Sequence, residues 1–130
     1  MSNKYLNCTG WAISGVASFP FVFGTLATLF PAIPSPTHQE MFHMGMPLHI
    51  EAILAVLSIL CLCLYWIPAT AILGAILFTG YMGGAILAHL RVGDPVELQI
   101  AVAILLWLGA WLRDSHLRAL IPLRRVGSAV

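Results

Sequence analysis

The stretch AILGAILFTGYMGGAILAHLRVGDPVE, residues 71–97, decides the fold of this chain. Residues 71–88 carry no charged side chain, and polar side chains then follow in quick succession: His89, Arg91, Asp94 and Glu97. An apolar run of this length is typical of a helix that crosses a bilayer. The polar cluster at its end indicates either the membrane boundary or a place where chemistry occurs.

The composition of the whole chain agrees with a membrane protein. Of its 130 residues 60% are hydrophobic and 8% are charged, with a mean hydropathy of +0.94, whereas a soluble domain carries about 25% charged residues. A backbone within lipid must satisfy its hydrogen bonds as helices or as a closed barrel. The strict alternation that a barrel strand requires is absent, so we expect an all-α protein. The net charge of +1 gives no indication of nucleic-acid binding.

Apolar segments within a single domain, residues 1–130, predict an integral membrane four-helix bundle. The predicted spans are residues 9–30, which Pro20 should kink, and residues 48–66, 70–91 and 95–112. Each has roughly 18–22 residues, enough to cross about 30 Å of hydrocarbon. Short links join the second, third and fourth spans, and such links require antiparallel neighbours.

Basic residues predict the orientation. They lie mainly outside the spans, with Lys4 before the first and Arg113, Arg118, Arg124 and Arg125 after the last. Between these two groups, Arg91 at the end of the third span is the only lysine or arginine. Because cytoplasmic segments carry the excess of these residues, we expect a multi-pass protein of a bacterial-type inner membrane with both termini in the cytoplasm. The tail, residues 113–130, is predicted to form a short amphipathic helix on the inner membrane surface; a merely basic end is the alternative.

The turn between the third and fourth spans has recognisable helix-end signals. Gly93 suits the position that follows a helix, and Pro95 suits the first position of the next one. Asp94 and Glu97 have the spacing of a capping box. We therefore expect Asp94 to cap the fourth helix through its carboxylate.

Ionisable side chains inside a span are costly and favour a functional site. The candidate ligand or partner site comprises Glu51, Ser58, Tyr81, His89, Arg91 and Asp94. Glu51 and His89 are expected at matching depths on antiparallel neighbours, so we predict that Glu51 pairs with His89 or Arg91. Such a polar track would bind a small amphipathic ligand such as a quinone, or carry protons. A purely structural ion pair that fixes helix register is the alternative.

Histidine and methionine gather in the loop between the first and second predicted spans and at the start of the second span: His38, Met41, His43, Met44, Met46 and His49. Thioether and imidazole ligands suit copper, so one interpretation is a copper site outside the cytoplasm. The spacing matches no fixed coordination motif, and methionine is common at membrane surfaces, so a loop without metal is the alternative.

Small residues recur at four-residue spacing on the third span: Gly80, Gly84 and Ala88. Small residues allow helix backbones in lipid to approach closely. We expect this stripe to pack against another helix of the same bundle, with homodimerisation as the alternative.

Residues 67–95, IPATAILGAILFTGYMGGAILAHLRVGDP, resemble the DoxX-like family of small four-helix membrane proteins. The resemblance continues through LLWLGAWL (residues 105–112) and RDSHLRALIPLR (residues 113–124), and MGMP (residues 44–47) looks like the element that opens the family's second span. Relatives often carry a glutamate where this chain has Ser58 and an arginine where it has Ala69. Glu51, on the same stripe, is our candidate substitute for that glutamate. The resemblance implies a four-helix bundle in the inner membrane and no single activity.

Three functions of different classes follow. The family name comes from a subunit of a thiosulfate:quinone oxidoreductase, and other members are linked to oxidative-stress assemblies or membrane-protein assembly. The first hypothesis is therefore a quinone-linked membrane subunit of a redox assembly, and the second is a non-catalytic accessory protein that binds other membrane-protein subunits or a second copy of itself. The third is an extracytoplasmic copper-binding protein. No Ser–His–Asp, paired-carboxylate or HExxH pattern indicates a catalytic site.

Overall fold

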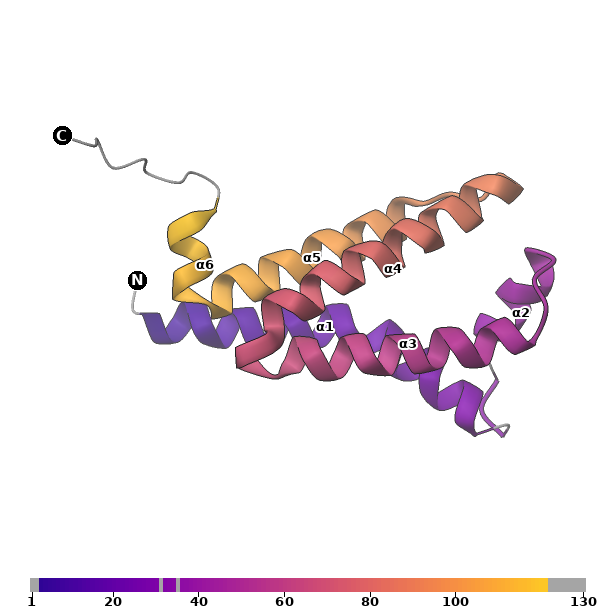
Figure 1. Ribbon diagram of the computed structural model, residues 1–130, viewed down its shortest axis with the longest axis horizontal. Helices are drawn as coiled ribbons and strands as arrows, with labels where there is room; N and C mark the ends of the chain where they lie inside the picture. Colours follow the sequence, from indigo (N-terminus) through magenta and orange to yellow (C-terminus); the bar gives the residue numbers. More distant parts are fainter. Residues whose placement is uncertain (1–2, 31, 35, 122–130) are drawn as a thin grey trace.

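The computed structural model describes residues 3–30, 32–34 and 36–121 (Figure 1). The regular elements of these residues are all helices: α1 (Asn3–Leu29), α2 (Pro36–His43), α3 (His49–Trp66), the 3₁₀ helix η1 (Pro68–Thr70), α4 (Ala71–Val92), α5 (Glu97–Arg113) and α6 (Ser115–Leu120). The all-α prediction is confirmed. Three stretches of the described residues are long and apolar enough to cross a membrane: Lys4–Leu29, His49–Trp66 and Pro68–Val92.

The long helices follow the predicted spans but differ from them at their ends. α1 begins at Asn3 and stays one helix through Pro20, and Figure 1 shows that it bends in its second half, as a proline inside a helix predicts. α5 begins at Glu97 and has 17 residues. Hydropathy does not predict α2, which begins with Pro36 at a position that proline favours. A search for apolar segments detects only the apolar part of a helix, so it misses helical turns that are polar.

The four long helices are neighbours in the order α1, α3, α4, α5, and α5 also contacts α1. Figure 1 shows α4 and α5 side by side, diverging from α3 toward the end of the molecule that carries α2. α6 and the first turns of α1 lie at the opposite end. The helices are therefore close together near α6 and open near α2.

Close packing near α6 centres on Tyr65, whose side chain is fully buried. Its hydroxyl donates a hydrogen bond to the Leu106 carbonyl oxygen at 2.7 Å and accepts one from the Ser14 hydroxyl at 2.9 Å. The Arg113 guanidinium lies 4.5 Å from the centre of the Tyr65 ring and donates to the Tyr65 carbonyl oxygen at 3.1 Å. Because a buried polar group without a partner is costly, these contacts hold α1, α3 and α5 together.

Two glycines allow the helices to approach closely around Tyr65. A Cβ atom added to Gly109 would collide with the Ser14 hydroxyl, and one added to Gly74 would lie 2.5 Å from the Tyr65 Cα atom. Both positions therefore require the absence of a side chain. At Gly74 the obstacle is the backbone of α3, which cannot shift without a cost in free energy.

The predicted stripe of small residues on α4 has different surroundings. A Cβ atom added to Gly80 or Gly84 would meet no atom within 4 Å outside its own helix. The prediction that these glycines pack against another helix of the same bundle is therefore wrong. The physical reason is that α4 diverges from α3 over this part of its length, which leaves the stripe facing open space.

The first part of the predicted amphipathic tail forms α6. The Asp114 carboxylate caps this helix, because it accepts hydrogen bonds from the backbone N–H groups of His116 at 2.8 Å and Leu117 at 3.3 Å. Leu117 is buried, so one side of α6 packs against its neighbour, the end of α5. Arg124 and Arg125, on which the predicted surface contact depends, lie outside the described residues.

Exchanging glycine for alanine at two positions of α4 tests the difference between its two halves. We expect Gly74→Ala to destabilise the protein by about 1–3 kcal/mol, because the new methyl group overpacks against α3. Gly84→Ala is the matched control and should be neutral or slightly stabilising, by up to about 1 kcal/mol, because alanine favours a helix more than glycine does. Thermal unfolding of both variants in the same detergent measures the effects, and equal unfolding temperatures would contradict the described packing.

Candidate functional site

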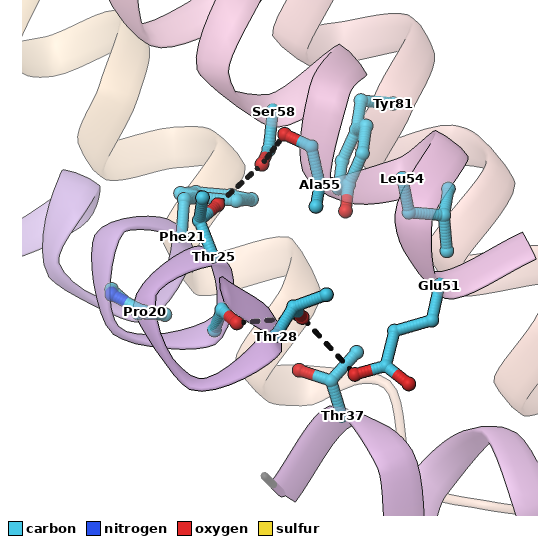
Figure 2. Close-up of a pocket in the computed structure, with 11 residues that line it drawn as sticks. Pro20, Phe21, Thr25, Thr28, Thr37, Glu51, Leu54, Ala55, Ser58 and Tyr81 are labelled. Atoms are coloured by element: carbon cyan, nitrogen blue, oxygen red, sulfur yellow. Dashed lines mark hydrogen bonds between the residues drawn. The ribbon is translucent and has the colours of Figure 1, made fainter. Parts of the chain in front are cut away.

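A small polar cavity lies between α1, α2, α3 and α4 at the open end of the molecule (Figure 2). It has a volume of about 70 Å³ and is lined by Pro20, Phe21, Gly24, Thr25, Thr28, Thr37, Glu51, Leu54, Ala55, Ser58 and Tyr81. Three of the six residues predicted for the ligand or partner site, Glu51, Ser58 and Tyr81, therefore line one cavity.

The carboxylate of Glu51 is the charged group of this cavity, and its side chain is only 10% exposed. Its Oε1 atom accepts a hydrogen bond from the Thr28 hydroxyl at 3.0 Å, and its Oε2 atom lies 3.1 Å from Nδ1 of His38. The predicted pairing with His89 or Arg91 is wrong in this structure. Because α4 diverges from α3, α1 and α2 are closer to Glu51 and supply its partners.

Hydroxyl groups form the rest of the polar lining. The Thr25 and Ser58 hydroxyls are 2.9 Å apart, and Ser58 donates to the Ala55 carbonyl oxygen at 2.9 Å, so Thr25 is the donor of the shared hydrogen bond. Figure 2 shows the Tyr81 hydroxyl directed into the cavity, and no hydrogen bond joins it to another described residue. The site can therefore accept hydrogen bonds as well as donate them.

Three threonines of this lining did not enter the predicted site: Thr25, Thr28 and Thr37. Thr25 and Thr28 are three residues apart on α1, so they lie on the same helix face. Hydroxyl groups repeated at helical spacing inside an apolar span are a signal that could have identified them. That signal would not have shown which of the other helices these threonines face.

The other predicted site residues form a second cluster around Asp94. Its carboxylate lies 3.2 Å from Nε2 of His43 and 3.4 Å from Nδ1 of His89. Arg91 instead donates to the Met44 carbonyl oxygen at 2.6 Å. These contacts tie the turn between α4 and α5 to α2 and the segment after it.

The turn itself agrees with only part of the prediction. Gly93 ends α4 in the left-handed conformation, with φ of 80°, as predicted. Asp94 does not cap the next helix, because α5 begins at Glu97 and its N-cap residue, Val96, makes no side-chain cap. The carboxylate is engaged by the two imidazoles instead. Its hydrogen bonds, chiefly the one from His43, hold the pKa of Asp94 below its usual value.

A larger groove, of about 690 Å³, lies beside the polar cavity between the diverging helices. Its lining includes three methionines of the proposed copper site, the three small residues of the α4 stripe and one residue of the predicted ligand or partner site. These residues are Met41, Met44, Met46, Gly80, Gly84, Ala88 and His89. The groove and the cavity share six lining residues, namely Pro20, Phe21, Gly24, Thr37, Leu54 and Tyr81. An apolar groove is therefore continuous with a polar cavity that contains one carboxylate.

The histidines and methionines proposed as copper ligands are dispersed. His38 lies against Glu51, His43 lies against Asp94, and His49 is exposed at the start of α3. The three methionines line the groove. Among the residues that the structure describes, no three His, Cys, Asp or Glu side chains are grouped so that they could hold a metal ion.

The lowered pKa of Asp94 predicts a dependence of stability on pH. Stabilisation by this carboxylate is complete above the usual pKa of 3.8 and is lost as the pH falls through the lower value of the folded state. Asp94→Asn should therefore unfold at a lower temperature than wild type at pH 6, and the difference should shrink toward pH 3. His43→Ala should make Asp94→Asn less damaging. A difference that stays constant with pH would contradict the described hydrogen bonds.

Comparisons with known proteins identify a family but no individual relative. No curated protein and no solved structure matches the chain. A family model does match, over residues 12–112, and its description is that of the DoxX-like family. Because this match covers most of the 130 residues and includes both the groove and the polar cavity, the chain belongs to the DoxX-like family.

Proposed function

We propose that this protein is a membrane-embedded subunit of a quinone-linked redox assembly and that the groove binds the ligand. The observation that carries the proposal is the continuity of the groove with the polar cavity. A small amphipathic molecule has an apolar body and a polar head, and this site offers matching surfaces for both. The groove volume of about 690 Å³ lies within the range of ligand pockets, roughly 300–1,000 Å³.

The lining supplies suitable chemistry for a quinone ring. Phe21 and Tyr81 stand at the junction of groove and cavity, with their ring centres 5.7 Å apart, and aromatic rings favour tilted or offset contacts with a further ring. The Tyr81 hydroxyl can donate to a quinone carbonyl oxygen or accept from a quinol hydroxyl. Methionine side chains adapt their shape to apolar ligands, and four of them, Met41, Met44, Met46 and Met82, line the groove.

We further propose that α5 completes a fourth span of an inner-membrane bundle with both termini in the cytoplasm. Support comes from the position of α6 beside the first turns of α1 (Figure 1) and from the basic residues that precede α1 and follow α5. The segment with α2 and the turn at Gly93 would then face outward.

Cysteine labelling tests this topology. In a variant without Cys8, Cys61 and Cys63, we expect a membrane-impermeant maleimide to reach Gln39→Cys from outside the cell and Ser115→Cys only after the membrane is opened. Both positions are exposed in the structure. Labelling of both positions from outside would contradict a span formed by α5.

A second candidate function is that of an accessory protein that binds another membrane-protein subunit or a second copy of the chain. The observation that favours it is the open space above Gly80 and Gly84, since small residues exposed on a membrane helix allow a partner helix to pack closely. We do not propose a copper site, because the described imidazoles of His38 and His43 lie against carboxylates.

Adjacent glycines of α4 provide a matched test of the ligand-binding groove. Gly84 lines the groove and Gly83 does not, and both have open space for a side chain. Gly84→Leu should lower the affinity for a short-chain quinone at least about tenfold, because the new side chain fills the groove, while Gly83→Leu keeps it. Tryptophan fluorescence quenching by the quinone, measured in lipid nanodiscs, gives both affinities.

The outcomes of this test separate the two candidate functions. Wild type that does not bind quinone, or equal affinities of the two leucine variants, would refute the proposed ligand site. Loss of a stoichiometric membrane partner from Gly84→Leu, with no quinone bound to wild type, would favour the accessory function.

A further inference from the structure

The polar cavity beside the groove meets the physical requirements for ordered water. Its volume of about 70 Å³ has room for roughly five water molecules, since one needs about 10–15 Å³ on this measure. A buried water also needs two to four polar partners, and apolar cavities of similar size stay dry. The carboxylate of Glu51 and the hydroxyls of five other lining residues, Thr25, Thr28, Thr37, Ser58 and Tyr81, supply such partners.

Some of these partners have hydrogen-bonding capacity that the described residues do not use. The Thr28 hydroxyl has a single proton and lies 3.0 Å from both Glu51 Oε1 and the Gly24 carbonyl oxygen, which leaves its lone pairs as acceptors. The Tyr81 hydroxyl points into the cavity (Figure 2) and bonds to no other described residue. Water in the cavity would satisfy these groups.

The cavity connects two different environments. On one side, Tyr81 lines both the cavity and the groove. On the other side, Glu51 Oε2 lies 3.1 Å from Nδ1 of His38, whose side chain is 54% exposed, against 10% for Glu51. Glutamate, histidine and tyrosine are all groups that can take up and release protons. The spatial order from the groove to the exposed surface is therefore groove, Tyr81, cavity, Glu51, His38.

We propose that the cavity holds a chain of water molecules that carries protons between the groove and the aqueous surface beside α2, through Tyr81, Glu51 and His38. The inference deepens the proposed function and rests on it only for the ligand, a hydroxyl-bearing amphipathic molecule such as a quinol. Histidine suits the outer end of this path, since one ring nitrogen can take a proton while the other releases one.

The proton transfer returns every group of the protein to its original protonation state. The O–H bond of the ligand breaks, and its proton enters the water chain at Tyr81. Each water and side chain along the path gives up one proton for each one that it takes, and His38 releases one to solvent. The electron pair stays on the ligand oxygen until an electron acceptor oxidises the ligand.

Water-edited solid-state NMR of the labelled protein in lipid vesicles tests for water in the cavity without any ligand. Magnetisation from water should reach Thr25 and Thr28 several-fold faster than Thr79, which lies mid-way along α4 with its hydroxyl bonded to the Ala75 carbonyl oxygen at 2.9 Å. Equal, slow transfer to all three threonines would refute the water chain.

A filled cavity provides the control for this measurement. Ala55 lines the cavity, and Ala52 is exposed on the same helix. Ala55→Leu should remove the fast transfer to Thr25 and Thr28, and Ala52→Leu should retain it. Persistence of the fast transfer in Ala55→Leu would place the water elsewhere.

A second experiment follows proton release from a bound quinol. Ferricyanide serves as the added electron acceptor, so that each quinol gives two electrons to two ferricyanide ions and two protons to solvent. Tyr81→Phe and Glu51→Gln should each slow the oxidation of bound quinol at least about tenfold, as expected when proton transfer is impaired and limits the rate, and should show a rate difference between H₂O and D₂O at least as large as that of wild type. Thr79→Val, outside the path, should keep the oxidation rate of wild type and its rate difference between H₂O and D₂O.

The two experiments distinguish failure of this inference from failure of the proposed function. If wild type binds no quinol, the ligand proposal fails, and the NMR measurement still decides whether the cavity contains water. If quinol binds but Thr25 and Thr28 are dry, or Tyr81→Phe oxidises its bound quinol at the wild-type rate, the proton path is wrong. Quinol affinity is measured separately for each variant, so that weaker binding is not mistaken for slower proton transfer.

Discussion

The hydrogen bonds of the Tyr65 hydroxyl are the interaction on which the arrangement of the helices depends. They join Tyr65 on α3 to Ser14 on α1 and to the backbone of α5 at Leu106. Lipid offers no hydrophobic drive between helices, so association relies on close packing and on such polar contacts. Gly74 and Gly109 allow this packing because each leaves space that the backbone or hydroxyl of a neighbouring helix occupies. The helices are consequently held together at the end that carries α6.

Close packing at one end allows the other end to open. α4 and α5 leave α3 toward the α2 end (Figure 1), and the Asp94 carboxylate, held by His43 and His89, ties their turn to α2. The groove thus lies between the contacts of Asp94 at the α2 end and packed aromatic side chains toward the α6 end, among them Phe21 and Phe78 with ring centres 4.7 Å apart.

The polar groups at the open end have separate roles. Glu51 is a nearly buried side chain in a cavity that adjoins the groove, whereas Asp94 is a more exposed side chain that connects the turn between α4 and α5 to α2. Ionisable groups near a membrane interior usually indicate function, and by burial and by position Glu51 fits that description better than Asp94. The hydroxyl groups that line its cavity come from α1, α2, α3 and α4, and they suit hydrogen bonding rather than the binding of a soft metal.

The sequence by itself determined that the chain is helical and apolar enough to lie in a membrane, because hydropathy and helix-end residues such as Gly93 are local properties. It also placed Glu51 and Ser58 on one helix face, because their seven-residue spacing corresponds to about two helical turns. Only the tertiary structure decided that Glu51 meets Thr28 and His38 instead of His89, and that Gly80 and Gly84 border a groove. These outcomes depend on where neighbouring helices touch and where they diverge. That divergence follows from contacts between residues distant in sequence, such as Tyr65 with Leu106, which no local pattern contains.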